Sequence, residues 1–220
     1  MTVSTLVNIY TSLFDHFGPQ KWWPGETPLE MLVGAVLTQN TNWSNVSRAI
    51  GNLKEENLLS FATLDSLSEA ELAENIRPSG YFNLKARRLK NLLALIRQEE
   101  PAGDLDLFFS RETSTLREKL LSVKGIGPET ADSILLYAAQ KPVFVVDTYT
   151  YRMLTRHGLI GQETDYAEMQ ELFMDTLPAD AKLFNEYHAL IVRLGKEYCK
   201  KSRPRCQQCP LRQFEPLLID

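Results

Sequence analysis

Long apolar runs are absent from this chain of 220 residues. Its apolar runs, such as residues 134–139 and 143–146, are far shorter than the roughly 18 apolar residues that a membrane-spanning helix needs. The N-terminus also lacks the charged-then-apolar pattern of a secretion signal. We therefore expect a soluble, intracellular, cytoplasmic protein with no membrane partner.

Cysteine is scarce, and its distribution is uneven. Cys199, Cys206 and Cys209 are the three cysteines, and all lie within eleven residues near the C-terminus. Such clustering does not suit the dispersed disulfides of a secreted scaffold. A reducing compartment and a metal centre explain it better.

An excess of positive charge is also missing. Lys and Arg number 24 against 28 Asp and Glu, so the formal charge is −4, which taken alone argues weakly against a nucleic-acid partner. The distribution differs from the total, because basic residues concentrate at 85–90 and 196–205, whereas acidic residues dominate 69–74 and 163–180. Solvated helix faces would explain either basic cluster on its own.

Sustained alternation of polar and apolar residues, the mark of β-strands, is absent apart from residues 143–146. Apolar residues instead recur at three- and four-residue spacing, which is helical periodicity. Gly and Pro interrupt this pattern at intervals. The sequence predicts an all-α protein of about ten short helices. The periodic stretches include 6–17, 29–37, 89–96, 116–121, 134–138, 151–156, 167–177 and 184–194.

Two glycines, Gly125 and Gly127, directly precede an apolar stretch that predicts a helix from about Glu129 to Tyr137. Such glycines allow a tight turn between helices and leave bare amides at a helix N-terminus, which together suit a phosphate. The same pair is also typical of a plain connection between two helices.

The continuation of this segment resembles a known family. VKGIGPETADSILLYA, followed by PVFVVDTYTYR, is similar to the helix-hairpin-helix and catalytic-aspartate motifs of the endonuclease III superfamily of DNA glycosylases. The resemblance implies a monomer with a two-lobed fold: a helical barrel domain over 28–138 that contains the hairpin, and a second helical domain from 1–27 and 139–220. Double-stranded DNA containing a damaged base would lie across the groove between the lobes.

The resemblance makes Asp147 the catalytic residue. An Asp ahead of a helical run is usually an N-cap, and both roles can hold at once. Departure of a base leaves positive charge on the deoxyribose. A carboxylate beside C1′ can stabilise that charge and orient water, as glycosidase carboxylates do.

Bifunctional members of the superfamily carry a lysine in the hairpin, eighteen residues before the aspartate. Glu129 occupies that position here, and a carboxylate cannot form a Schiff base. We therefore expect a monofunctional enzyme that hydrolyses the N-glycosidic bond without cutting the strand. Lys124 keeps a bifunctional glycosylase/AP lyase open as an alternative, and a non-catalytic DNA-binding module would use the hairpin and ignore Asp147.

Three further runs, WWP at 22–24, LTQNT at 37–41 and RPSG at 77–80, make the chain similar to the 3-methyladenine DNA glycosylase III branch. The resemblance places Trp22, Trp23, Pro24 and Trp43 around the flipped base and Lys196 near the aspartate. Because a cationic alkylated purine stacks well on aromatic rings, 3-methyladenine is the leading substrate. Mismatched uracil or thymine and oxidised pyrimidines follow.

The same resemblance assigns DNA contacts. Gln39 would fill the hole left by the flipped nucleotide, and Tyr81 would wedge the opposing strand. The basic stretch 85–90 would lie along the backbone. The remaining expected contacts are Lys85, Arg88, Lys124, Gly125, Gly127, Thr130, Lys200 and Arg205.

Cys199, Cys206 and Cys209 have the spacing of the first three ligands in the C-x6-C-x2-C-x5-C loop that holds a [4Fe–4S] cluster in endonuclease III relatives. Glu215 stands where the fourth cysteine would be, so the loop spans 199–215. Three interpretations remain: a four-iron cluster with Glu215 or solvent on the unique iron, a labile or three-iron cluster, and a relic loop without metal.

Overall fold

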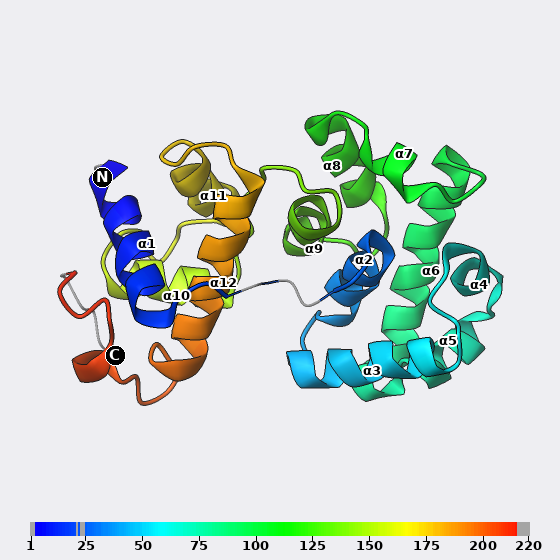
Figure 1. Cartoon of the computed structure of the whole chain (residues 1–220), viewed down its shortest axis with the longest axis horizontal. Helices are drawn as coiled ribbons and strands as arrows, with labels where there is room; N and C mark the ends of the chain where they lie inside the picture. Colours follow the sequence, from blue (N-terminus) through cyan, green and yellow to red (C-terminus); the bar gives the residue numbers. More distant parts are fainter. Residues whose placement is uncertain (1–2, 21, 23–24, 215–220) are drawn as a thin grey trace. The chain divides into compact units, whose positions relative to one another are not determined.

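The computed structural model describes residues 3–20, 22 and 25–214, without the side chains of residues 3 and 4. They form two compact units, Gly25–Lys141 and the segments Met1–Pro24 with Pro142–Asp220. Every regular element in the described ranges is helical, which confirms the all-α prediction (Figure 1). None of these helices has the length and apolar character needed to cross a membrane.

The unit Gly25–Lys141 is built around α2 (Pro28–Leu37), whose residues are almost all buried. A helix that is apolar on every side belongs inside a core, and α2 contacts α3, α6, α9 and η2. The other elements of this unit are α3 (Trp43–Glu55), α4 (Phe61–Ser66), α5 (Glu69–Asn75), η1 (Arg77–Ser79), α6 (Phe82–Glu99), α7 (Leu105–Phe109), α8 (Thr113–Ser122), α9 (Pro128–Ser133) and η2 (Ile134–Ala138).

Local chemistry sets many helix starts in this unit. The side chains of Thr27, Asn42, Ser60 and Asp104 each accept a hydrogen bond from a backbone N–H in the following first turn. These bonds satisfy donors that have no partner inside the helix. The short helices α4 and α7 have too few residues for periodicity to show, and capping rather than amphipathic spacing marks where they begin.

The expected helix from about Glu129 to Tyr137 is not a regular α-helix throughout. It is α-helical over Pro128–Ser133 and widens into a π-helical segment over Ile134–Ala138. The Ala139 N–H donates to the Ile134 carbonyl five residues earlier, at 3.0 Å. A π-turn fits one extra residue into a helical turn, and this segment contacts the central α2.

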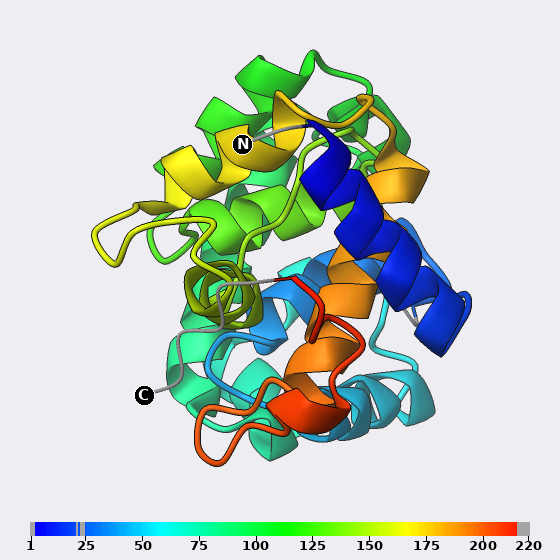
Figure 2. The same ribbon diagram turned by 90° about the vertical axis from the view of Figure 1, so that its left-hand side faces the viewer.

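The second unit contains α1 (Val3–Phe17), α10 (Thr148–Arg156), α11 (Tyr166–Met174), α12 (Ala181–Glu197) and the short turn η3 (Cys206–Gln208). The long helix α12 packs against both α1 and α10, and α1 runs beside α12 in Figure 2. Residues 143–146 are buried but form no strand. Phe144 stacks on Phe173, with ring centroids 3.9 Å apart, so the segment leading to α10 is anchored in the core.

Candidate active site

Asp147 lies between that buried extended segment and the first turn of α10. Its Oδ1 accepts hydrogen bonds from the Tyr149 and Thr150 amides, at 2.9 and 2.8 Å, and from the Thr150 hydroxyl at 3.0 Å. Asp147 is therefore the N-cap of α10, and the positive end of the helix favours its negative charge. The capping role expected of this residue is confirmed.

The second carboxylate oxygen of Asp147 faces α12. Asp147 Oδ2 lies 3.6 Å from His188 Nε2, and the two side chains are only 11% and 7% exposed. Burial raises the pKa of Asp147, but the contact with His188 and the hydrogen bonds from Thr150 outweigh it, so the pKa is lower than usual. The carboxylate is held ionised in a largely buried position.

Sequence reasoning missed His188, which follows Asp147 by more than forty residues. A single histidine in an apolar helix is usually a core residue. The packing of α12 against α10 brings it to the carboxylate.

Close packing between these two helices also explains Gly195. A Cβ atom on Gly195 would lie 2.1 Å from Cδ1 of Tyr149, so the approach requires glycine there. The next residue, Lys196, has its Nζ 5.7 Å from the centroid of the Trp22 ring. The structure thus brings together two of the predicted base-pocket residues. Trp23 and Pro24 lie outside the described residues, and Trp43 begins α3 in the other unit.

The hairpin joins α8 to α9. Gly125 has φ +99°, and a Cβ atom there would lie 2.5 Å from Cγ of Arg88. Gly127, at φ −98°, is the N-cap of α9 and has open space around it. Asn91 Nδ2 donates to the Lys124 carbonyl at 3.0 Å, so α6 supports the turn. The tight turn expected from the two glycines is present.

Gln39 is bound to this hairpin. Its Nε2 donates to the Gly125 carbonyl at 3.1 Å and to Thr130 Oγ1 at 2.9 Å, while its Oε1 accepts from Arg88 at 2.5 Å. Four predicted DNA-contact residues therefore form one network. Gln39 would have to exchange these bonds to fill a vacated position in a duplex, so its predicted role stays a prediction.

Lys85 corrects the expectation that the basic stretch 85–90 lies along a DNA backbone. It is 1% exposed, and its Nζ donates to the carbonyls of Leu37 and Ser79 at 2.8 and 2.7 Å. Burial, followed by the charge of Arg88, lowers its pKa to about 8. Lys85 therefore points inward and donates to a carbonyl at the C-terminal end of α2, where the carbonyls have no donor inside the helix.

Lys90 is used in a similar way. Its Nζ donates to the carbonyls of Leu64, Asp65 and Leu67, at 3.2, 2.5 and 2.7 Å, and so covers the end of α4. Two of the basic side chains in this stretch are thus structural.

Tyr81 is the most prominent exposed aromatic among the described residues. Its side chain is 71% exposed, and its backbone is left-handed at φ +46°. It follows Gly80, which also has a positive φ, and it caps the start of α6. This placement is compatible with the predicted wedge. Lys124, Lys196 and Arg205 are exposed and Lys200 is half-buried.

Comparison with known proteins identifies the family. Residues 33–179 match the HhH-GPD superfamily base excision DNA repair protein family. The chain belongs to this superfamily. A relative from Methanocaldococcus jannaschii, named "Putative DNA repair glycosylase MJ1434", is 47% identical over 209 residues, covering 95% of this chain and 94% of its own. The protein is therefore a DNA repair glycosylase that acts on N-glycosyl bonds.

Solved structures agree with this assignment. Helicobacter pylori 3-methyladenine DNA glycosylase (MagIII) bound to 1,N6-ethenoadenine is 33% identical, with a TM-score of 0.75 over 90% of this chain and 98% of that one. A non-covalent endonuclease III–DNA complex has a TM-score of 0.79 at 22% identity and covers 97% of this chain and 95% of that one. At 22% identity, the similarity to the endonuclease III complex shows the fold alone.

The C-terminal tail of the glycosylase contains the three cysteines of the predicted cluster. Burial, together with the neighbouring Cys199 and Cys206, raises the pKa of the Cys209 thiol to about 11, whereas a bound metal would lower it, because a metal ligand is a thiolate. Across the described residues, no three His, Cys, Asp or Glu side chains gather in a way that could hold a metal ion. Glu215 lies outside the described residues. The [4Fe–4S] cluster therefore stays a prediction.

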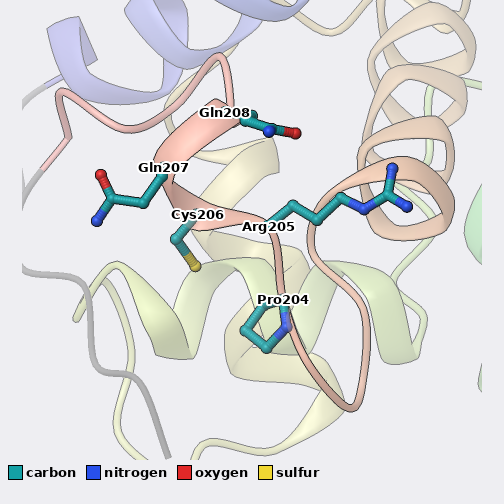
Figure 3. Close-up of a pocket in the computed structure, with 5 residues that line it drawn as sticks. All are labelled: Pro204, Arg205, Cys206, Gln207 and Gln208. Carbon is teal, nitrogen blue, oxygen red and sulfur yellow. The ribbon is translucent and has the colours of Figure 1, made fainter.

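Arginines of α10 hold the tail by other means. Arg152 Nε donates to the Cys199 carbonyl at 2.6 Å, and Arg156 donates to Cys199 Sγ at 3.3 Å and to the Lys200 carbonyl at 2.8 Å. Beyond them, residues 204–208 line an open hollow of about 460 Å³. Arg205 and Gln207 project to opposite sides of this turn (Figure 3).

Proposed function

We propose that this glycosylase is monofunctional and excises an alkylated purine such as 3-methyladenine, with Asp147 as its catalytic carboxylate. The observation that carries the proposal is the ionised, largely buried Asp147, whose Oδ1 is occupied by helix N-terminal donors and whose Oδ2 is free of those bonds. A fixed negative charge of this kind stabilises the positive charge that develops on a deoxyribose as its base departs.

The substrate assignment draws on two independent features. Lys196 and Trp22 lie together beside the end of α12, and an indole face attracts a cationic purine. The MagIII relative was solved with 1,N6-ethenoadenine, an alkylated adenine. A cationic base leaves readily, so such a substrate needs little help from a general acid.

The hairpin supports the proposed absence of lyase activity. Glu129 is an exposed residue in the first turn of α9, at the position of the lysine in bifunctional enzymes. Lys124 is the exposed amine of the same hairpin. A lyase would therefore depend on Lys124, and the Lys124→Met variant tests this alternative directly.

The deciding experiment is a panel of duplexes, each carrying one lesion, incubated with enzyme and analysed with and without alkali. We expect release of alkylated purine, strand breaks only after alkali, and no adduct trapped by borohydride. Efficient nicking without alkali, lost in Lys124→Met, would establish the bifunctional alternative. Release of mismatched thymine or oxidised pyrimidine in preference to alkylated purine would reject the substrate assignment.

Asp147→Asn tests the catalytic role. Asn is as good an N-cap as Asp, so α10 should remain folded, whereas the negative charge is lost. We expect base release to fall by roughly a hundredfold or more, with binding to a duplex containing an abasic-site analogue retained. Unchanged base release would exclude Asp147 as the catalytic residue.

For the tail, we propose a loop that is held by Arg152 and Arg156 without metal. The test is the absorption at about 400 nm, together with iron and sulfide analysis, after anaerobic purification. We expect a colourless protein. A brown protein with stoichiometric iron and sulfide would instead establish a cluster in which the three cysteines rearrange.

A further inference from the structure

We infer that His188 is a positioning residue for Asp147, which orients the free carboxylate oxygen and keeps the carboxylate ionised during base release. This inference rests on the proposed catalytic role of Asp147. The observation that carries it is the 3.6 Å separation between Asp147 Oδ2 and His188 Nε2, with both side chains almost completely buried. Because His188 is buried beside Asp147, its imidazole faces the carboxylate and has little contact with solvent.

The two oxygens of Asp147 have different partners. All three short hydrogen bonds, from two amides and the Thr150 hydroxyl, go to Oδ1 and come from the first turn of α10. Oδ2 is directed at α12, where His188 lies. Because Oδ1 is already occupied, Oδ2 is the oxygen available to face the sugar or an attacking water, and His188 is the group that controls its orientation.

Other polar side chains of α12 and α10 have partners of their own. The Tyr187 hydroxyl donates to the Leu6 carbonyl, and Glu186 accepts from the Gln20 amide. Lys196 lies against the Trp22 ring, and Arg152 binds the Cys199 carbonyl. On α10, Tyr149 and Thr150 supply the N-terminal donors. His188 is the side chain on α12 whose contact with Asp147 lowers the pKa of that carboxyl.

The chemistry of the pair follows from these contacts. A protonated imidazole favours the ionised carboxylate by charge, and a neutral imidazole with its proton on Nε2 still donates toward Oδ2. A distance of 3.6 Å can shorten when substrate closes the site. The ionised carboxylate is then a weak base but a strong electrostatic partner for a cationic sugar, which suits a substrate whose base departs readily.

The test uses two variants at this position. His188→Leu keeps an apolar side chain of moderate size and removes both donor and charge, whereas His188→Gln keeps an amide donor without the charge. Base release is measured in single-turnover reactions on the alkylated-purine duplex from about pH 3 to pH 8, with the duplex alone as the background at each pH. Circular dichroism at each pH confirms that the variants remain folded.

We expect His188→Leu to move the acidic limb of the rate profile to higher pH by about one unit and to lower the plateau rate roughly tenfold. His188→Gln should recover much of the plateau but retain part of the shifted limb. Affinity for a duplex with an abasic-site analogue should be unchanged in both. Tyr187→Phe, a neighbouring buried change on α12, serves as the control and should leave the acidic limb in place.

An acidic limb and a plateau that are both unchanged in His188→Leu would overturn the inference. If that variant does not fold, His188→Gln decides, because an unmoved limb there has the same meaning. Asp147→Asn separates this failure from that of the proposed function. An inactive Asp147→Asn beside an unaffected His188→Leu refutes only the role of His188, whereas an active Asp147→Asn refutes both.

Discussion

The hairpin contains a matched pair of glycines that should respond very differently to the same substitution. Gly125 has φ +99°, and a Cβ atom on it would lie 2.5 Å from Cγ and 2.9 Å from Nε of Arg88. Gly127 has an ordinary φ of −98°, and a Cβ atom on it would have no atom within 4 Å. Gly125→Ala and Gly127→Ala therefore make one chemical change in two environments.

The expected cost of Gly125→Ala has two parts. Holding alanine at a strongly positive φ costs about 1–3 kcal/mol, and forcing Arg88 away adds about 1 kcal/mol or more. The smaller entropy of the unfolded chain returns about 0.4–1 kcal/mol, so the net loss is about 1–3.6 kcal/mol. In Gly127→Ala that gain offsets a slightly poorer N-cap, and the net change is close to zero.

Urea unfolding followed by circular dichroism measures both free energies of unfolding, and thermal unfolding should show a fall of roughly 2–14 °C in the Tm of Gly125→Ala. Displacement of Arg88 would also weaken the hydrogen bond that Arg88 donates to Gln39 Oε1. Gly125→Ala should therefore alter the solvent accessibility of the Gln39 side-chain amide. If the two variants differ by less than about 0.5 kcal/mol, the geometric reasoning about the turn is wrong.

Two further predictions concern buried charges. Arg117 on α8 donates hydrogen bonds of 2.7 and 3.0 Å to the fully buried Asp132 on α9, so Arg117→Met should lower the free energy of unfolding by about 3 kcal/mol. Arg77→Met, which removes the exposed ion pair with Glu74, should lower it by at most about 1 kcal/mol. Equal losses in urea unfolding would contradict this prediction. Because the pKa of Lys85 is lowered from 10.5 to about 8, the unfolded state binds its proton more tightly between those values. The free energy of unfolding should therefore rise between about pH 8 and pH 10.5, by up to about 3 kcal/mol relative to that of Lys85→Met. If the free energies of unfolding of the two proteins change in parallel with pH, the prediction is wrong.

Features that depend on residues close together in the sequence could be predicted from the sequence. The helical class follows from apolar spacing, and the hairpin turn follows from Gly125 and Gly127, whose backbone demands are local. The capping role of Asp147 is local too, because its bonds go to residues two and three positions later. The similarity of the motifs to known glycosylases identified the family before any contact was seen.

Other features depended on which helices pack together. Lys85 and Lys90 were expected on a DNA-binding face because a basic run is usually exposed, yet each ends among backbone carbonyls of a different helix. The sequence does not say which carbonyls lack donors, since that depends on where α2 and α4 stop beside α6.

His188 shows the same division at the active site. The sequence by itself determined the family, the catalytic carboxylate as a candidate and the hairpin turn. Only the tertiary structure placed His188 against one oxygen of Asp147, because α12 meets α10 through long-range packing that no local pattern encodes. Capping and turn chemistry act over a few residues, whereas the environment of a buried charge is set by helices that are distant in the chain.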